Sequence, residues 1–106
     1  MFKNLFAGKK DINHYVSLFK EDPSSAYLLD VRADDEYEDK HIPGSIHIPL
    51  SGLAEAEYDM PDKEKTVYVY CKSGQRAGHA VTMLQVMGYE NAVNIGGIDA
   101  YKGETE

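Results

Sequence analysis

The stretch that decides the fold lies past the middle of the chain and reads Thr66-Val67-Tyr68-Val69-Tyr70-Cys71-Lys72-Ser73-Gly74-Gln75-Arg76. Residues 66–70 are β-branched or aromatic throughout, which predicts a strand. After Arg76 the apolar residues recur at helical spacing, so residues 71–76 form a loop that leaves a strand and enters a helix. Backbone N–H groups in such a loop, and at a helix N-terminus, favour negative charge. The same field lowers the pKa of a thiol and attracts an anionic substrate.

The rest of the chain alternates between strand-like and helix-like segments. Short apolar runs predict strands at residues 26–31, 45–49, 66–70 and 92–95, the last broken by Gly96-Gly97. One-sided apolar patterns and short acidic or apolar stretches predict helical segments at 12–21, 34–38, 50–58, 76–87 and 98–101. This alternation predicts an α/β fold, a mainly parallel sheet with helices on both faces. In such sheets ligands bind beyond the carboxyl ends of the strands, where Cys71 lies.

Length and composition limit the possible functions. The chain has 106 residues, which suits one domain; we expect residues 11–106 to form it, after an N-terminal segment of uncertain order at residues 1–10. The formal net charge of −7 argues against nucleic acid and anionic membrane surfaces as partners. No stretch approaches the roughly 20 apolar residues of a membrane span, and the start is too short and polar for a secretory signal.

A single cysteine excludes an internal disulfide and predicts a reducing, cytoplasmic setting. His14, His47 and His79 show no ligand spacing with acids or with Cys71, so we expect no metal site and no other cofactor. Nothing in the sequence demands more than a monomer.

Several short motifs occur in one order and spacing. They are Leu28-Leu29-Asp30-Val31-Arg32, Glu36-Tyr37, His41-Ile42-Pro43-Gly44-Ser45-Ile46, Ile48-Pro49, Val67-Tyr68-Val69-Tyr70-Cys71 with Ser73-Gly74 and Arg76, Gly88-Tyr89, and Gly96-Gly97. Each motif alone is weak, but together they make a chain that resembles a single-domain rhodanese, a sulfurtransferase, from about Asp11 to Gly103. The resemblance implies a rhodanese-like three-layer α/β/α domain.

The resemblance also implies a mechanism for Cys71. Its thiolate would take the outer sulfur of thiosulfate or of a persulfide donor, carry it as a persulfide, and pass it to a thiophilic acceptor such as a small thiol or a protein. The chain has no second cysteine, so the sulfur must leave on another molecule. The implied partners are therefore a small anionic sulfur donor and a thiol or protein acceptor.

The residues after Cys71 would form an anion-binding cradle made of Lys72, Ser73, Gly74, Gln75 and Arg76. Arg76 offers a planar fork for a sulfonate-like group, and Lys72 adds a mobile charge at the mouth. Ser73 can donate a hydrogen bond to the sulfur. Gly74 permits a backbone shape that a side chain would block.

Four further residues are expected to support the structure: Asp30, Arg32, Glu36 and His41. We expect an Arg32–Glu36 ion pair under the end of the sheet, shielded from solvent, whose disruption would leave a buried charge without its partner. His41 precedes a Pro-Gly turn and is interpreted as a structural turn histidine. Many relatives place a tryptophan after the paired glycines, whereas the nearest aromatic residue here is Tyr101.

Other functions remain open on the same residues. A lone cysteine at a strand end is often only a small buried hydrophobe, and the domain could be a non-catalytic persulfide carrier or a regulatory module. Phosphatases and arsenate reductases built on this fold have one more residue in the loop. Four residues separate Cys71 from Arg76, so the shorter loop favours sulfur transfer over phosphate or arsenate chemistry.

Overall fold

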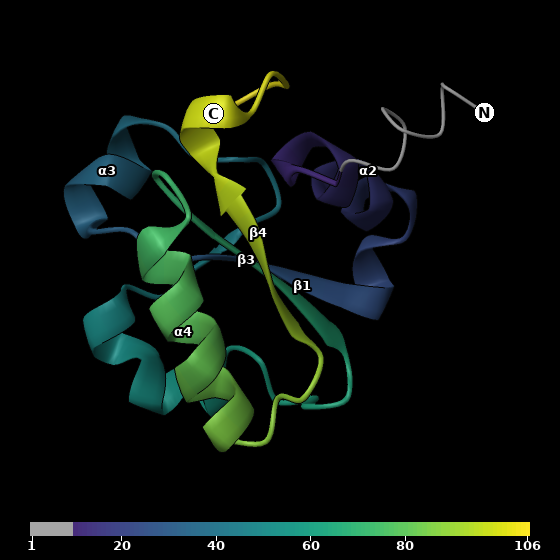
Figure 1. Ribbon diagram of the computed structural model, residues 1–106, viewed down its shortest axis with the longest axis vertical. Coiled ribbons are helices and arrows are strands. Elements are labelled where there is room, and N and C mark those ends of the chain that lie inside the picture. Colours follow the sequence, from purple (N-terminus) through teal and green to yellow (C-terminus); the bar gives the residue numbers. More distant parts are fainter. Residues whose placement is uncertain (1–9) are drawn as a thin grey trace.

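Within residues 10–106, which the computed structural model describes, four parallel strands form a sheet in the order β2-β1-β3-β4 (Figure 1). The strands are β1 (Ala26–Asp30), β2 (Ile46–His47), β3 (Thr66–Cys71) and β4 (Ala92–Gly97). The prediction for the N-terminal segment falls, apart from Lys10, outside the described residues. The two central strands end together, because Asp30 of β1 is in register with Tyr70 of β3.

Helices cover both faces of this sheet, which confirms the predicted three-layer α/β/α arrangement. The helical elements are α2 (Ile12–Glu21), η1 (Pro23–Ser25), α3 (Asp34–Asp39), η2 (Leu50–Tyr58), α4 (Gln75–Val86) and η3 (Ile98–Ala100). Helix α2 lies on one face, whereas α4 and η2 lie on the other (Figure 1). No helix in residues 10–106 combines the length and the hydropathy needed to cross a membrane.

Alternation along β3 divides the core in two. Val67, Val69 and Cys71 pack on the side of α4, in a cluster that includes Leu84. Tyr70 packs on the side of α2, in the second cluster. Successive residues of a strand point to opposite faces, so the position of Cys71 in the strand turns its side chain toward the start of α4.

The C-terminal strand differs from its prediction. We expected Gly96-Gly97 to break it, but β4 continues through Gly97. The reason is a bulge: Val69 pairs with Asn94, Tyr70 pairs with Gly96, and the residue between has no partner. Gly96 supplies the left-handed backbone angle that this irregularity needs, with φ of +104°. Pairing then resumes, and Gly97 lies opposite Cys71.

Candidate active site

Cys71 is the last residue of β3, and its side chain is almost fully buried, with 1% of the residue exposed. Its Sγ accepts hydrogen bonds from the backbone N–H of Gly74 at 3.0 Å and of Ala77 at 3.3 Å. Both backbone donors thus converge on the sulfur, and hydrogen bonds of this kind are stronger to a charged acceptor than to a neutral one. Ala77 was missed by the sequence argument because a backbone amide leaves no trace in the residue type.

The loop after Cys71 depends on glycine in two places. Gly74 has φ of +102° and is the N-cap of α4, a conformation that side chains disfavour. A Cβ on Gly97 would overlap the carbonyl of Lys72 and the Cα of Ser73. The loop after Cys71 therefore rests directly on the backbone of β4, which explains the paired glycines better than a strand break does.

Asn94 ties the loop to β4. Its Nδ2 donates to the Gly74 carbonyl at 2.9 Å, and its Oδ1 accepts from the Gly96 N–H, also at 2.9 Å. The side chain thus fixes the peptide groups of both glycines that have a positive φ. Sequence reasoning passed over Asn94, although an Asn two residues before a glycine is a typical signal of a side chain that bonds its own backbone.

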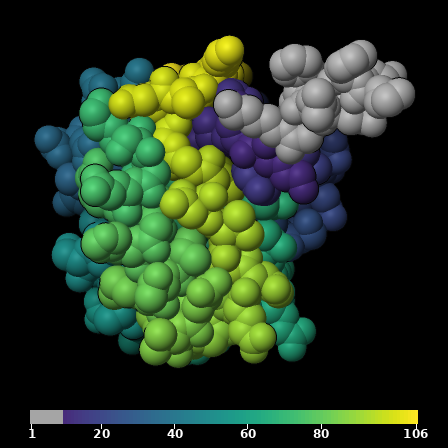
Figure 2. Space-filling view, viewed as in Figure 1, coloured from purple at the N-terminus to yellow at the C-terminus, as the bar shows by residue number. Residues whose placement is uncertain are grey.

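A hollow of about 450 Å³ lies beside the loop, lined by Ser73, Gly74, Asn94 and the start of α2. Figure 2 shows β4, in yellow, at the surface between α4, in green, and α2, in purple. Ser73 was expected to donate to the sulfur, but the donors to Sγ are the two backbone N–H groups alone among the described residues. Gln75 begins α4.

The expected Arg32–Glu36 ion pair is wrong. Arg32 binds Asp30, with Nη2 2.7 Å from Oδ2, and Glu36 binds Arg76 through two contacts, of 2.7 Å and 3.1 Å. The expectation placed Arg32 beside Glu36 under the end of the sheet. Arg32 precedes α3, however, and its side chain folds back toward the end of β1.

The Glu36–Arg76 pair links α3 to the start of α4, and so braces the catalytic loop from outside. The hydrogen bond from Arg76 lowers the pKa of Glu36 to about 2, helped by the Ala33 N–H and opposed by burial. Both terminal guanidinium nitrogens of Arg76, Nη1 and Nη2, donate to the carboxylate. The planar fork expected to receive a sulfonate is therefore already occupied by a carboxylate of the chain.

Asp30 and Arg32 form a second, deeper pair, with side chains 0% and 4% exposed. Asp30 accepts from the Arg32 backbone N–H and from its Nε and Nη2, and Arg32 also donates to the Lys40 carbonyl. Burial opposes the charge of Arg32, but the hydrogen bonds and charge of Asp30 outweigh it and raise the pKa of Arg32. This network closes the end of β1.

His41 contacts the turn rather than the sulfur. Its Nδ1 lies 2.9 Å from the Tyr37 carbonyl oxygen, its ring stacks on the Tyr37 ring at 3.8 Å, and its backbone exchanges hydrogen bonds with Glu106. Tyr101 packs against the core on the α2 side. Across residues 10–106, no group of three or more His, Cys, Asp or Glu side chains could hold a metal ion.

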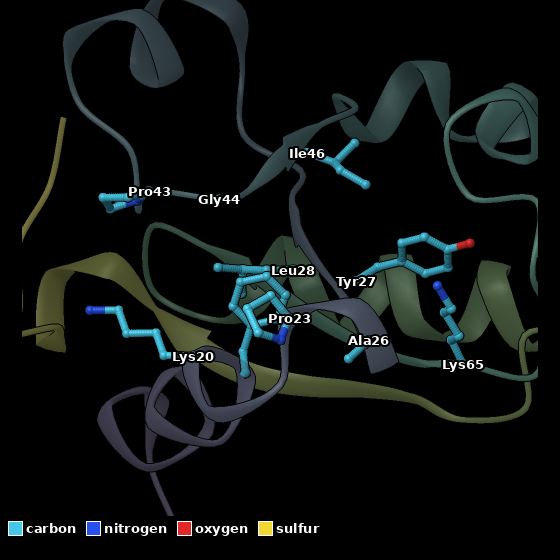
Figure 3. A pocket seen from close by; sticks show the side chains of 10 residues that line it. Lys20, Pro23, Ala26, Tyr27, Leu28, Pro43, Gly44, Ile46 and Lys65 are labelled. Carbon is cyan, nitrogen blue, oxygen red and sulfur yellow. The ribbon is translucent and has the colours of Figure 1, made fainter.

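A separate hollow of about 560 Å³ lies at the opposite, amino end of the strands, between Leu28, Pro23, Pro43 and Ile46 (Figure 3). Its polar lining consists of Lys20, Lys65 and Tyr27, with neither a thiol nor a carboxylate. The groups suited to nucleophilic chemistry are instead gathered at the carboxyl end of β3, around Cys71.

Comparison with known proteins identifies the family of the chain. The family model described as "Rhodanese-like domain" matches residues 13–104. The thiosulfate sulfurtransferase PspE of Escherichia coli is 38% identical over 76 residues, which cover 71% of this chain and 73% of the relative. The thiosulfate sulfurtransferase GlpE of Coxiella burnetii is 31% identical over 94 residues, covering 88% of this chain and 87% of the relative.

The solved structures show the same fold. A structure described as "rhodanese with anions from E. coli" superposes with a TM-score of 0.72 at 35% identity and covers 76% of this chain and 96% of its own. The family match spans most of the chain, and the relatives named above are sulfurtransferases of similar length. The chain therefore belongs to the rhodanese-like family, and its function is that of a sulfurtransferase.

Proposed function

We propose that this chain moves a sulfane sulfur from thiosulfate or a persulfide donor to a thiophilic acceptor, with Cys71 as nucleophile and sulfur carrier. One observation carries the proposal: the sole thiol accepts two backbone N–H groups at the start of α4, within a loop of rhodanese length. That arrangement suits an anionic sulfur, whether thiolate or persulfide.

The reaction has two displacements. The Cys71 thiolate attacks the outer sulfur of thiosulfate, the Sγ–S bond forms, and the bond to the inner sulfur breaks, so that sulfite leaves with the electron pair. The acceptor then attacks the outer sulfur of the persulfide, and Cys71 leaves as a thiolate. With cyanide as acceptor the product is thiocyanate, and no external oxidant or reductant is needed.

The cradle for the donor and for the persulfide is formed by Lys72, Ser73, Gly74, Gln75 and Arg76. Because Arg76 is bound to Glu36, its main contribution is to hold the loop, and backbone N–H groups provide most of the attraction for an anion. We place the reaction in the reducing cytoplasm, with the protein as a monomer. Asp30, Arg32, Glu36 and His41 hold the loops around the site.

Intact mass spectrometry tests the proposal directly. After incubation with thiosulfate, the protein should gain the mass of one sulfur atom, and added cyanide should remove it. The Cys71→Ser variant should gain nothing and should keep the melting temperature of the parent within a few degrees, because the substitution is nearly isosteric. Sulfur bound to Cys71→Ser, or none bound to the parent with either class of donor, would overturn the proposal.

A carrier that does not turn over is the competing function. It would load one sulfur yet fail to release it to cyanide or to small thiols. Hydrolysis of a phosphate monoester that depends on Cys71 would instead indicate a phosphatase.

A further inference from the structure

Both cationic side chains of the loop are neutralised by carboxylates. Arg76 is bound to Glu36. The Nζ of Lys72 lies 3.2 Å from both carboxylate oxygens of Asp99. The side-chain charges around the loop therefore sum to zero, within a protein whose formal net charge is −7.

Asp99 is fixed to the catalytic loop at two points. Besides the ion pair, its backbone N–H donates to the Lys72 carbonyl at 3.1 Å. It belongs to η3, which follows β4 directly after Gly97, the residue paired with Cys71. The Asp99 carboxylate is thus held against Lys72, the first residue of the loop, by the segment whose backbone also contacts the loop.

The two carboxylates differ in what they support. Glu36 is 27% exposed and braces α3 against α4, so its loss would disturb the scaffold. Asp99 is 58% exposed, and its partner Lys72 is 61% exposed. Exposed pairs add little stability, so the charge of Asp99 can be removed with little cost to the fold. We expect the Asp99 charge to act instead on charged molecules that approach Cys71.

We propose that Asp99 is a specificity-determining residue that disfavours doubly charged sulfur donors relative to donors of lower charge. The inference rests on the proposed sulfur transfer, and it names the class of donor that the site prefers. Coulomb energy is proportional to the charge of the donor. Removal of Asp99 should therefore accelerate the reaction of a dianion by the square of the factor found for a monoanion.

Two donors of different charge provide the test. Thiosulfate carries two negative charges and releases sulfite, whereas benzenethiosulfonate carries one and releases benzenesulfinate, both by transfer of the outer sulfur to the Cys71 thiolate. In Asp99→Asn, we expect the second-order rate of persulfide formation to rise about tenfold with thiosulfate and about threefold with benzenethiosulfonate at low ionic strength. Both gains should shrink toward one at about 1 M salt, where the Debye length is about 3 Å.

Asp59→Asn is the matched control. It changes the net charge by the same amount. Asp59 follows η2 and precedes Met60, whose carbonyl accepts a hydrogen bond from Tyr89, near the amino end of β4. We expect the rates of both donors to stay within about twofold of the parent, because the Coulomb energy falls as the distance between the charges grows. Equal gains in the two variants would mean that net charge, and not Asp99, sets the donor preference.

A second readout does not need sulfur transfer. Iodoacetate and iodoacetamide react with the same thiolate and differ by one negative charge, so the ratio of their rates reports the potential at Cys71 and is independent of the thiolate fraction. This ratio should rise about threefold in Asp99→Asn and stay constant in Asp59→Asn. An unchanged ratio in Asp99→Asn overturns the inference, even if sulfur transfer is confirmed.

Failure of the proposed function would look different. If neither donor loads sulfur onto the parent protein, sulfur transfer by this chain is refuted. The alkylation ratio then decides alone whether Asp99 sets the potential that charged reagents meet at Cys71.

Discussion

Two strand-to-helix loops leave the sheet at the same edge, and they treat a negative charge in opposite ways. At the end of β1, Asp30 accepts the Arg32 backbone N–H and is also bound by the Arg32 guanidinium. At the end of the adjacent β3, Cys71 accepts hydrogen bonds, within residues 10–106, from backbone N–H groups only. The loop after β1 thus contains its own anion and its own cation, and we call it the closed loop. The loop after β3 is called the open loop.

The same strand-to-helix architecture therefore serves two purposes, structural support in one loop and reactivity in the other. Parallel strands bring loop N–H groups to one edge, and these groups attract anions wherever they converge. In the loop after β1, the attraction is satisfied by a carboxylate that is paired and buried. In the loop after β3 it is directed at a sulfur atom, without a side-chain cation bound to that atom among the described residues. The second loop can therefore stabilise an added anionic sulfur.

The first and strongest prediction removes the ion pair of the closed loop. Arg32→Ala removes the cation and leaves the Asp30 carboxylate, which is 0% exposed, without its main partner. We expect the free energy of unfolding to fall by about 3–5 kcal/mol, as is usual when one member of a buried pair is removed. Urea unfolding at neutral pH measures it. Arg76→Ala is the comparison, and because Arg76 is 38% exposed, it should cost about 1 kcal/mol or less. Similar losses in the two variants would contradict the distinction between a closed and an open loop.

The next effect displaces the open loop. In Gly97→Ala the new Cβ overlaps the backbone of Lys72 and Ser73, which must move. We expect a loss of stability of about 1–3 kcal/mol from overpacking. We also expect the rate of sulfur loading to fall at least about tenfold, since the backbone N–H groups would no longer point at Sγ. Mass spectrometry over time gives the rate. Gly52→Ala is the control, because a Cβ there meets its nearest atom at an ordinary 3.9 Å. Unchanged loading in Gly97→Ala would show that β4 does not position the loop.

A pH experiment isolates the contribution of the Glu36–Arg76 ion pair, the brace between α3 and α4, from that of the closed loop. Glu36 has its pKa lowered from 4.5 to about 2, so its ion pair with Arg76 stabilises the fold fully above pH 4.5. That stabilisation is lost as the pH falls from about 4.5 toward 2. We expect Glu36→Gln to be less stable than the parent by about 1 kcal/mol or less at pH 7, a figure reduced because Arg76 is partly exposed.

Urea unfolding at pH 7 and pH 3 tests this difference. The gap in the free energy of unfolding between the parent and Glu36→Gln should narrow at pH 3, because the unfolded parent then protonates Glu36 while the folded parent still keeps the carboxylate ionised. A gap that is constant from pH 7 to pH 3 would show that the carboxylate charge contributes nothing to the brace.

The smallest expected effect concerns the Asn94 side chain. Asn94→Ala removes two hydrogen bonds that fix the peptide groups of Gly74 and Gly96. We expect a loss of about 1 kcal/mol in stability, and sulfur loading slower by a few-fold, since the Gly74 N–H faces the sulfur less constantly. Asn91→Ala is a close control, because its Nδ2 also donates to a backbone carbonyl, that of Glu64 at 2.8 Å, at the far end of β4. Equal loading rates in the two variants would deny Asn94 a role in positioning.

Much of this arrangement follows from the sequence because it depends on residue periodicity. The apolar runs at β1 and β3 and the stripe of α4 predict the three layers, and the position of Cys71 at a strand end predicts the edge at which it lies. The partners in ion pairs are harder to predict, because Arg32 and Glu36 are separated by a turn that the sequence does not reveal. The bulge before Gly96 and the Ala77 N–H depend on backbone geometry, which residue types specify only weakly.

The burial of Cys71 also affects how long the enzyme survives oxidants. A thiolate can be oxidised through sulfenic to sulfinic acid, and its susceptibility rises with its exposure. The chain has no second cysteine that could capture a sulfenic acid as an internal disulfide, so an oxidised Cys71 would depend on external thiols for repair. With only 1% of the residue exposed, the sulfur offers little surface to peroxide and to a sulfur donor alike. Shielding of this kind slows oxidation and sulfur loading together.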